Sequence, residues 1–371
     1  MSDSQNKNYL FIDTQQDLDD LSSVLIQASK LAMDTEFVRR STYYPILSLV
    51  QIATETDIYL IDPFKVDDWS GLVQVFDSET QFVMHSCSED LEVFRAAFGA
   101  LPKRLIDTQI ASAYLGMGDA LGYAALVALM CDQDVDKSET QSDWTQRPLT
   151  TAQMRYAAED VRWLIEISDT LEAELEKRNR AGWVEQEVTS LKKKYIQEPE
   201  ANKSWLKLKG VKRLPKSDWA LAKRLCAWRE ETARRLDKPK SWIVKDNEIM
   251  EIISHRPSST AELSNLSLIS PVFVRRNGKA VLSQIKESKA LSAPQESPGE
   301  ELDSGDRKIL KSMQQLVSDY SEKHGLAARF VANKQELTNF ILYHRNKSSQ
   351  PSSLDDGWRK SELGEKLLSL I

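Results

Sequence analysis

The segment LAMDTEFV, residues 31–38, carries two acids within a run of apolar residues. Asp34 and Glu36 are two positions apart, so in a β-strand both carboxylates project from the same face. Because Asp and Glu are disfavoured in strands, the apolar flanks predict a strand that is central and buried. Two like charges buried there are costly, and a divalent cation can compensate them. The alternative is a strand end whose acids face solvent.

The first 176 residues place further strands and helices around this segment. Short apolar runs predict four more strands, at residues 9–12, 47–54, 57–61 and 81–86. Amphipathic helical stretches separate these runs, so the region is predicted to form a mixed α/β sheet covered by helices. From about residue 180 the strand signals stop, and the remainder is predicted to be all-helical.

Another acid follows the strand predicted at 81–86. The stretch HSCSEDLEVF ends that strand and begins a helix near Ser88, which brings Glu89 and Asp90 to the junction. Strand-to-helix junctions lie at the rim of an α/β sheet, where binding sites form. Acids in a first helical turn can also serve only to complement the helix dipole.

The motif YAAED lies on a long helix predicted over roughly residues 150–178. Tyr156 and Asp160 are four residues apart, so they share one face of that helix and can hold a water between them. Tyr156 alone also fits a half-buried helix aromatic with a wet hydroxyl.

Charge and composition restrict the class of protein. Residues 1–176 contain 12 Lys and Arg against 31 Asp and Glu, whereas residues 177–245 contain 20 against 8, within a chain of net charge −7. An acidic region repels phosphate unless cations intervene, and the basic stretch attracts it from a distance. Both regions could also be ordinary solvated surface. The cysteines have no paired spacing, and no leader or membrane-spanning run is evident, so a soluble cytoplasmic protein is expected.

The order of these motifs is specific. DTE on an early strand, an acid after a later strand and Yx₃D on a helix resemble the DEDD superfamily of 3′→5′ exonucleases, in its tyrosine-containing branch. Longer segments such as LAMDTEFVRRSTYYPILSLVQIA, LIDTQIA, DKSETQSDW and RPLT are similar to the ribonuclease D family. The resemblance runs from about residue 9 to the C-terminus. It implies a ribonuclease H-like exonuclease domain over residues 1–180, and it assigns Glu89 no motif position.

The resemblance also implies a role for each motif residue. Asp34 would bridge two divalent metal ions, Glu36 and Asp160 would complete the shell of one ion, and Asp90 would serve the other. Hard oxygen ligands favour Mg²⁺ or Mn²⁺ over zinc. Tyr156, a poor proton acceptor at neutral pH with a usual pKa of about 10, is expected to orient the attacking water.

The helical remainder resembles HRDC domains. After a basic connector at 181–211, the resemblance implies a first HRDC-type bundle at 212–290, a Pro- and Ser-rich linker at 291–306, and a second, more divergent bundle at 307–371. SWIVKDNEIMEII (241–253) aligns with RFVANKQELTNFI (329–341). The alignment pairs Trp242 with Phe330 and Glu248 with Glu336, although two unrelated amphipathic helices could match by chance.

The basic stretch is the candidate RNA-binding surface. Trp219 and Trp228 lie at helical spacing and are as well explained as core residues, so the candidate contacts are the neighbouring cations Lys203, Lys207, Lys209, Lys212 and Arg213.

The expected protein is a monomeric α/β plus all-α exoribonuclease that releases nucleoside 5′-monophosphates from the 3′ ends of transfer-RNA precursors and other structured RNAs. This substrate comes from the resemblance alone. The sequence also fits a DNA 3′→5′ exonuclease, because nothing in residues 1–176 visibly recognises a 2′-hydroxyl. A catalytically silent RNA-binding scaffold is the alternative from another class.

Overall fold

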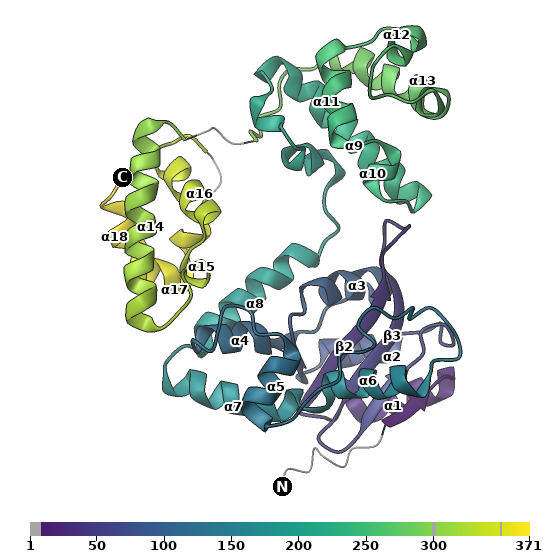
Figure 1. The fold of residues 1–371 in the computed structure, drawn as a ribbon, viewed down its shortest axis with the longest axis vertical. Helices are drawn as coiled ribbons and strands as arrows, with labels where there is room; N and C mark the ends of the chain where they lie inside the picture. The colour runs from purple at the N-terminus through teal and green to yellow at the C-terminus, as the bar shows by residue number, and fades with distance from the viewer. Residues whose placement is uncertain (1–8, 299–301, 349–350) are drawn as a thin grey trace.

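The computed structural model describes residues 9–298, 302–348 and 351–371. Its first region contains one mixed sheet (Figure 1). The strand order of this sheet is β1-β4-β3-β2-β5-β6. The strands are β1 (Tyr9–Ile12), β2 (Lys30–Val38), β3 (Ile46–Ala53), β4 (Ile58–Ile61), β5 (Gln81–Met84) and β6 (Arg104–Asp107). The mixed sheet and the central place of β2 were predicted. The edge strand β6 was not.

Helices cover both faces of this sheet. Alternate residues of β2 belong to different hydrophobic clusters: Ala32 joins the cluster on the Asp34 face, and Met33 joins the cluster on the opposite face. The helices of this region are α1 (Gln15–Leu25), α2 (Ser70–Asp77), α3 (Ser88–Phe98), α4 (Thr108–Tyr114), α5 (Tyr123–Cys131), α6 (Thr151–Arg162) and α7 (Leu164–Lys177).

The long helix predicted over 150–178 is wrong, because it breaks at Trp163 into α6 and α7. The Tyr123 hydroxyl donates to the Glu159 carbonyl at 2.7 Å and accepts the Trp163 amide at 3.3 Å. In an unbroken α-helix the Trp163 amide would donate directly to the Glu159 carbonyl. A side chain inserted into the helical ladder is a known cause of a kink, and here it lies beside Asp160.

Beyond α8 (Ala181–Tyr195) the chain forms a helical unit with a hydrophobic core of its own. Trp205 is fully buried in that core. The unit consists of η2 (Ala201–Lys207), η3 (Val211–Arg213), η4 (Lys216–Asp218), α9 (Trp219–Leu236), α10 (Lys240–Ile243), α11 (Asp246–His255), α12 (Thr260–Ser264) and α13 (Pro271–Ser288).

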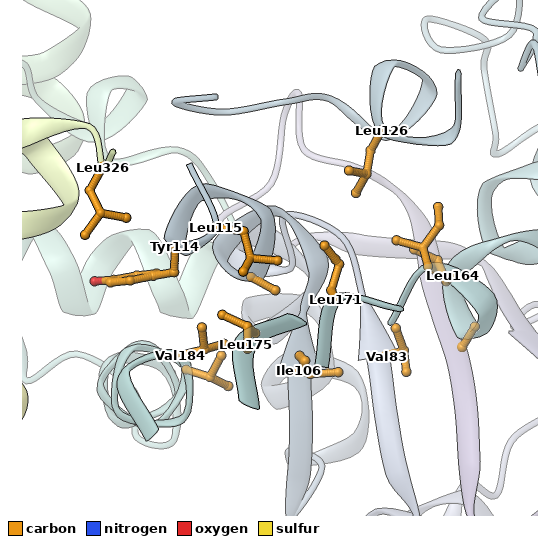
Figure 2. Packing of buried hydrophobic residues seen from close by; sticks show 14 of the residues in the cluster. Val83, Ile106, Tyr114, Leu115, Leu126, Leu164, Leu171, Leu175, Val184 and Leu326 are labelled. Carbon is orange, nitrogen blue, oxygen red and sulfur yellow. The ribbon is translucent and has the colours of Figure 1, made fainter. Parts of the chain in front are cut away.

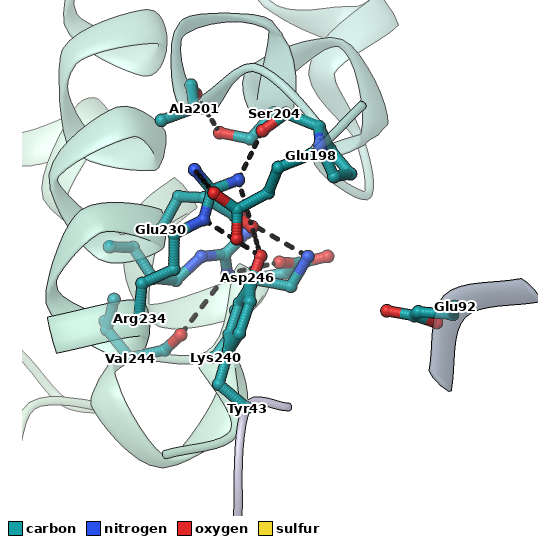
Figure 3. A network of polar contacts seen from close by, with 12 residues as sticks. Tyr43, Glu92, Glu198, Ala201, Ser204, Glu230, Arg234, Lys240, Val244 and Asp246 are labelled. Carbon is teal, nitrogen blue, oxygen red and sulfur yellow. Dashed lines mark hydrogen bonds and ion pairs between the residues drawn. The ribbon is translucent and has the colours of Figure 1, made fainter. Parts of the chain in front are cut away.

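This unit contacts the turn between β2 and β3 (Figure 3). The Tyr43 hydroxyl donates to the buried carboxylate of Glu230 and accepts from Arg234 Nε at 3.1 Å. The backbone amides of Tyr43 and Tyr44 donate to Asp237 Oδ1 at 2.9 and 3.1 Å. The turn that follows the acidic strand is therefore fixed to α9.

The last helical unit packs directly on the sheet region. It consists of α14 (Ser304–His324), α15 (Ala328–Val331), α16 (Lys334–His344), η5 (Ser353–Asp355), α17 (Gly357–Arg359), η6 (Lys360–Gly364) and α18 (Glu365–Leu368). Leu326 lies beside Tyr114 within the cluster that continues to Val184 (Figure 2). Arg180 donates to the carbonyls of Tyr114 and His324, at 2.7 and 2.8 Å, and so ties the two parts together.

The two helical units share a local structure at the aligned segments. In each, a four-residue helix, α10 or α15, precedes a longer one, α11 or α16. Glu248 accepts the Lys245 amide at 2.6 Å, and Glu336 accepts the Asn333 amide at 2.8 Å. The aligned glutamates thus accept the amide of the residue before each helix, and in α16 the Asn333 side chain also accepts the Glu336 amide at 3.0 Å and completes a capping box. Among the residues that the structure describes, no helix is both long and apolar enough to span a bilayer.

Candidate active site

Asp34 and Glu36 lie on β2, between the antiparallel strand β3 and the parallel strand β5. In the β2–β3 register Asp34 is opposite Gln51 and Glu36 is opposite Leu49. The register shifts directly after Glu36, at Phe37. Such a bulge bends a strand and re-aims its side chains. Asp34 and Glu36 lie on the face of the sheet that α6 covers. Glu36 is the last residue before the regular β2–β3 pairing is interrupted.

Asp90 reaches the site from the first turn of α3. Asp107 shapes the corner before this helix, because its carboxylate accepts the backbone amides of Ser86 at 3.1 Å and Cys87 at 2.9 Å. Asp90 is only 6% exposed, and its Oδ1 accepts a hydrogen bond from the Thr35 hydroxyl. A surface acid that only complemented the helix dipole would be exposed, so the buried position of Asp90 favours a role in the site.

Tyr156 and Asp160 come from α6, which begins with a capping box at Thr150. The Tyr156 hydroxyl lies 3.3 Å from the Thr140 hydroxyl, and its ring packs 5.9 Å from the ring of Trp144. The loop before α6 therefore covers the tyrosine. The five motif residues predicted from sequence come from β2, α3 and α6. The charges of the acids raise the pKa of Asp34 and of Tyr156, so these elements bring the five side chains close together.

Burial disfavours the ionisation of all four carboxyl groups, and the charges of neighbouring acids add to this effect. Burial, followed by the charges of Asp90, Asp160 and Glu36, raises the pKa of Asp34 well above its usual value. Burial and the charges of Asp160 and Asp90 raise the pKa of Glu36 to about 9. Burial likewise raises the pKa of Asp90 to about 6 and that of Asp160 to about 7, although the Thr35 and Tyr156 hydroxyls oppose these two shifts.

This arrangement fits a hard divalent cation. The donor set consists only of carboxylate oxygens, which Mg²⁺ and Mn²⁺ prefer. No ion pair in the described part of the chain joins any of the four groups to a basic side chain, so a cation would supply the missing counter-charge. No three His, Cys, Asp or Glu side chains of the described ranges converge on one point. The charges of Asp90, Asp160 and Glu36 nevertheless act on Asp34, and carboxylates on fixed backbones can turn about their side-chain torsions to meet an ion.

A cavity of about 490 Å³ opens beside Glu36. Arg39 and Arg40 line it from the β2–β3 turn, and Thr140 and Trp144 line it from the loop before α6. Arg39 is paired with Glu92 at 2.6 Å. The cavity therefore places the side chains of Arg39 and Arg40 beside Glu36.

The loop before α6 is anchored by Arg147. Its guanidinium binds the buried carboxylate of Asp62, with Nε 2.7 Å from Oδ2, and donates to the Ser48 carbonyl at 2.7 Å. This ion pair fixes the segment that carries Thr140 and Trp144 over the cavity. Asp107 and Arg147 had not been identified as site residues. The signals were available: Asp107 has the position and residue type of a helix cap, and Arg147 lies in the RPLT segment.

The candidate RNA-binding cations lie where the basic stretch passes from η2 to η3. All five are exposed, and Lys203 pairs with Glu200 at 2.6 Å. Trp219 and Trp228 pack against the core of the first helical unit, and the Trp219 indole donates to the Leu214 carbonyl at 3.2 Å. Their placement is that of core residues rather than of stacking platforms.

Comparison with known proteins gives the same picture as this geometry. Residues 9–176 match the model of a 3′-5′ exonuclease domain, and residues 218–285 match the HRDC domain. Ribonuclease D of Escherichia coli K12 is 33% identical over 376 residues, covering 98% of each chain. Ribonuclease D of Pseudomonas paraeruginosa is 35% identical over 346 residues, covering 92% of each. The chain belongs to the ribonuclease D family.

Solved structures agree with that membership. The crystal structure of Escherichia coli RNase D, an exoribonuclease involved in structured RNA processing, superimposes with a TM-score of 0.92 at 32% identity over 98% of both chains. The catalytic core of RRP6 from Trypanosoma brucei gives a TM-score of 0.58 at 27% identity, covering 77% of this chain and 82% of that one. The predicted family and fold class are confirmed. As a ribonuclease D-family protein the chain is a hydrolytic 3′-5′ exoribonuclease, and its exonuclease domain is of a divalent-metal-dependent kind.

Proposed function

We propose that this chain shortens structured RNA from the 3′ end by two-metal-ion hydrolysis, releasing nucleoside 5′-monophosphates. The observation that carries the proposal is the cluster of Asp34, Glu36, Asp90 and Asp160: Asp90 is buried, the other three are half-buried, all four have a raised pKa, and none has a basic partner in the described ranges. Protein interiors keep such a cluster where cations neutralise it.

Each acid has a proposed role. Asp34, at the centre of the cluster, would hold both ions, Glu36 and Asp160 would hold one, and Asp90 would hold the other. When bound, a pair of divalent ions stabilises the charge that develops on the attacking and leaving oxygens and lowers the pKa of water. The hydroxyl of Thr35, which donates to Asp90, keeps that acid oriented.

Tyr156 is proposed to orient the attacking water. Burial, with the nearby charge of Asp160, raises the pKa of its phenol well above the usual value, so the hydroxyl stays protonated at neutral pH. It can donate and accept hydrogen bonds but cannot remove a proton. The 3.3 Å contact with the Thr140 hydroxyl limits its rotation.

RNA binding is proposed to depend on the basic stretch. The acidic first region repels a polyanion, whereas residues 177–245 have a net charge of +12, from 20 cations against 8 acids. The first contacts would come from the exposed cations Lys203, Lys207, Lys209, Lys212 and Arg213. Transfer-RNA precursors are proposed as substrates on the resemblance to the ribonuclease D family, and a monomeric enzyme in the cytoplasm is proposed with them. The divergent repeat supports a second HRDC-type bundle at 307–371.

Incubation of the purified protein with a 3′-extended transfer RNA in Mg²⁺, Mn²⁺ or EDTA tests the proposal. We expect stepwise shortening from the 3′ end with either metal and none in EDTA. A DNA oligonucleotide of matched sequence separates the ribonuclease from a DNA exonuclease. Equal degradation of DNA, or metal-independent shortening of the RNA, would contradict the proposal.

A further inference from the structure

Gln51 is a buried polar residue without hydrogen-bond partners. It lies on β3 with 0% exposure, and within the described structure neither Oε1 nor Nε2 has a partner. A buried amide left in this state destabilises the fold, because it has lost its hydrogen bonds to water and gained none. A native protein keeps such a side chain for a reason, because leucine at this position would remove the cost.

The register of the sheet places Gln51 next to the acidic cluster. Gln51 is directly opposite Asp34 in the antiparallel β2–β3 pair, and directly opposite residues project from the same face of the sheet. Their Cβ atoms are about 4.5–5.5 Å apart in such pairs, a span that a glutamine side chain can bridge. On its other side Gln51 is opposite Leu60, which is apolar and fully buried.

The neighbours of Gln51 along β3 make its polarity exceptional. Leu49 and Ala53 lie on the same face and are both fully buried in the hydrophobic cluster beneath α6 and α7. Gln51 is thus a neutral amide set between apolar residues, beside Asp34. A cation at this position would neutralise Asp34 and compete with a bound metal ion, whereas an amide donates a hydrogen bond without adding charge.

We propose that Gln51 is a positioning residue of the catalytic centre, whose Nε2 donates a hydrogen bond to a carboxylate oxygen of Asp34 when that group is ionised and binds metal. The contact would hold Asp34 in the rotamer that presents its other oxygen lone pairs to the ions. Residues that orient metal ligands in this way are worth about 10–100-fold in metal affinity or activity. The inference rests on the proposed metal-binding role of Asp34.

Gln51→Met tests this role, because methionine has a similar length and no amide. We expect Mn²⁺ binding, measured by calorimetry without RNA, to weaken by about 10–100-fold. We also expect kcat to fall with little change in KM, because Gln51 is buried away from the RNA. In EDTA the variant should melt at the parent's temperature or above it, because an unpartnered amide has been removed.

Ile52→Met is the matched control. Ile52 is the next residue on β3, is equally buried, and faces the opposite hydrophobic cluster. It should show parental metal binding and kcat. Parental metal affinity in Gln51→Met would overturn the proposal, and so would a lower melting temperature in EDTA with unchanged affinity, because the amide would then serve only the fold. If the parent protein itself neither binds Mn²⁺ nor hydrolyses RNA, the proposed function fails instead, whatever Gln51 does.

Discussion

Neutralising Glu36 should stabilise the metal-free protein at alkaline pH. The pKa of Glu36 is raised to about 9 from a usual value of 4.5, mainly by burial and then by the charges of Asp160 and Asp90. Between these two pH values the unfolded chain has lost the proton that the folded protein retains. Rising pH therefore favours unfolding, and the loss of stability begins near pH 4.5 and is complete near pH 9.

The magnitude follows from the same shift. At pH 7.5 the unfolded group is about three pH units above its own pKa, and at 1.36 kcal/mol per unit the cost approaches about 4 kcal/mol. Reorientation of the carboxyl toward the cavity beside it lowers this figure, so we expect about 2–4 kcal/mol. Glu36→Gln carries no such proton linkage, and it also removes a charge that raises the pKa of Asp34.

Urea denaturation in EDTA at pH 5.0, 6.5 and 8.0 measures this effect. The parent should lose stability across the series, whereas Glu36→Gln should lose less and exceed the parent at pH 8.0. Adding Mg²⁺ should stabilise the parent, by about 2.7 kcal/mol when the ion is at one hundred times its Kd, and should stabilise the variant less. Glu55→Gln removes the same charge from an exposed position in the turn between β3 and β4 and should follow the parent. Parallel pH profiles for parent and Glu36→Gln would refute the reasoning.

Three further results are expected. Tyr156→Phe should lower kcat by about 10–100-fold, because the hydroxyl orients the attacking water. Its Mn²⁺ affinity, measured by calorimetry, should stay within about twofold of the parent's, because the hydroxyl does not bind metal; an unchanged kcat would contradict the proposed role. Tyr43→Phe should leave the buried carboxylate of Glu230 without one hydrogen-bond donor and lower the free energy of unfolding by about 1–3 kcal/mol. It should also speed the hydrogen exchange of backbone amides in the β2–β3 turn but not in α14; unaltered exchange would show that the contact is not formed in solution. Reversing the charge of the five exposed cations at residues 203–213 should weaken RNA binding and flatten its salt dependence, measured by fluorescence anisotropy; binding equal to the parent's would exclude this surface.

Much of the catalytic region could be predicted because its signals are local. The two-residue spacing of Asp34 and Glu36 in an apolar strand indicates buried charge, and the four-residue spacing of Tyr156 and Asp160 indicates one helical face. The structure places both pairs on the expected elements. Which metals bind, and which residue holds each, still rests on family resemblance and stays a prediction.

The features that escaped prediction depend on contacts between distant segments. The break at Trp163 is caused by the hydroxyl of Tyr123, 40 residues earlier in the chain, and no pattern within the helix reveals it. The last helical unit is attached through Arg180 and the backbone carbonyls of Tyr114 and His324, and carbonyl acceptors leave no trace in side-chain patterning. Strand β6 was missed because its sequence, RLID, has only two consecutive apolar residues between Arg104, which is exposed, and Asp107.

The central claim is that the clustered carboxylates catalyse metal-dependent hydrolysis at RNA 3′ ends. Its most direct test is to identify the product released from a 3′-end-labelled transfer-RNA precursor by the parent and by Asp34→Asn, with RNA binding measured for both. We expect the parent to release labelled nucleoside 5′-monophosphate only when Mg²⁺ or Mn²⁺ is present, and Asp34→Asn to bind the RNA and release none. Parental product formation by Asp34→Asn would contradict the account.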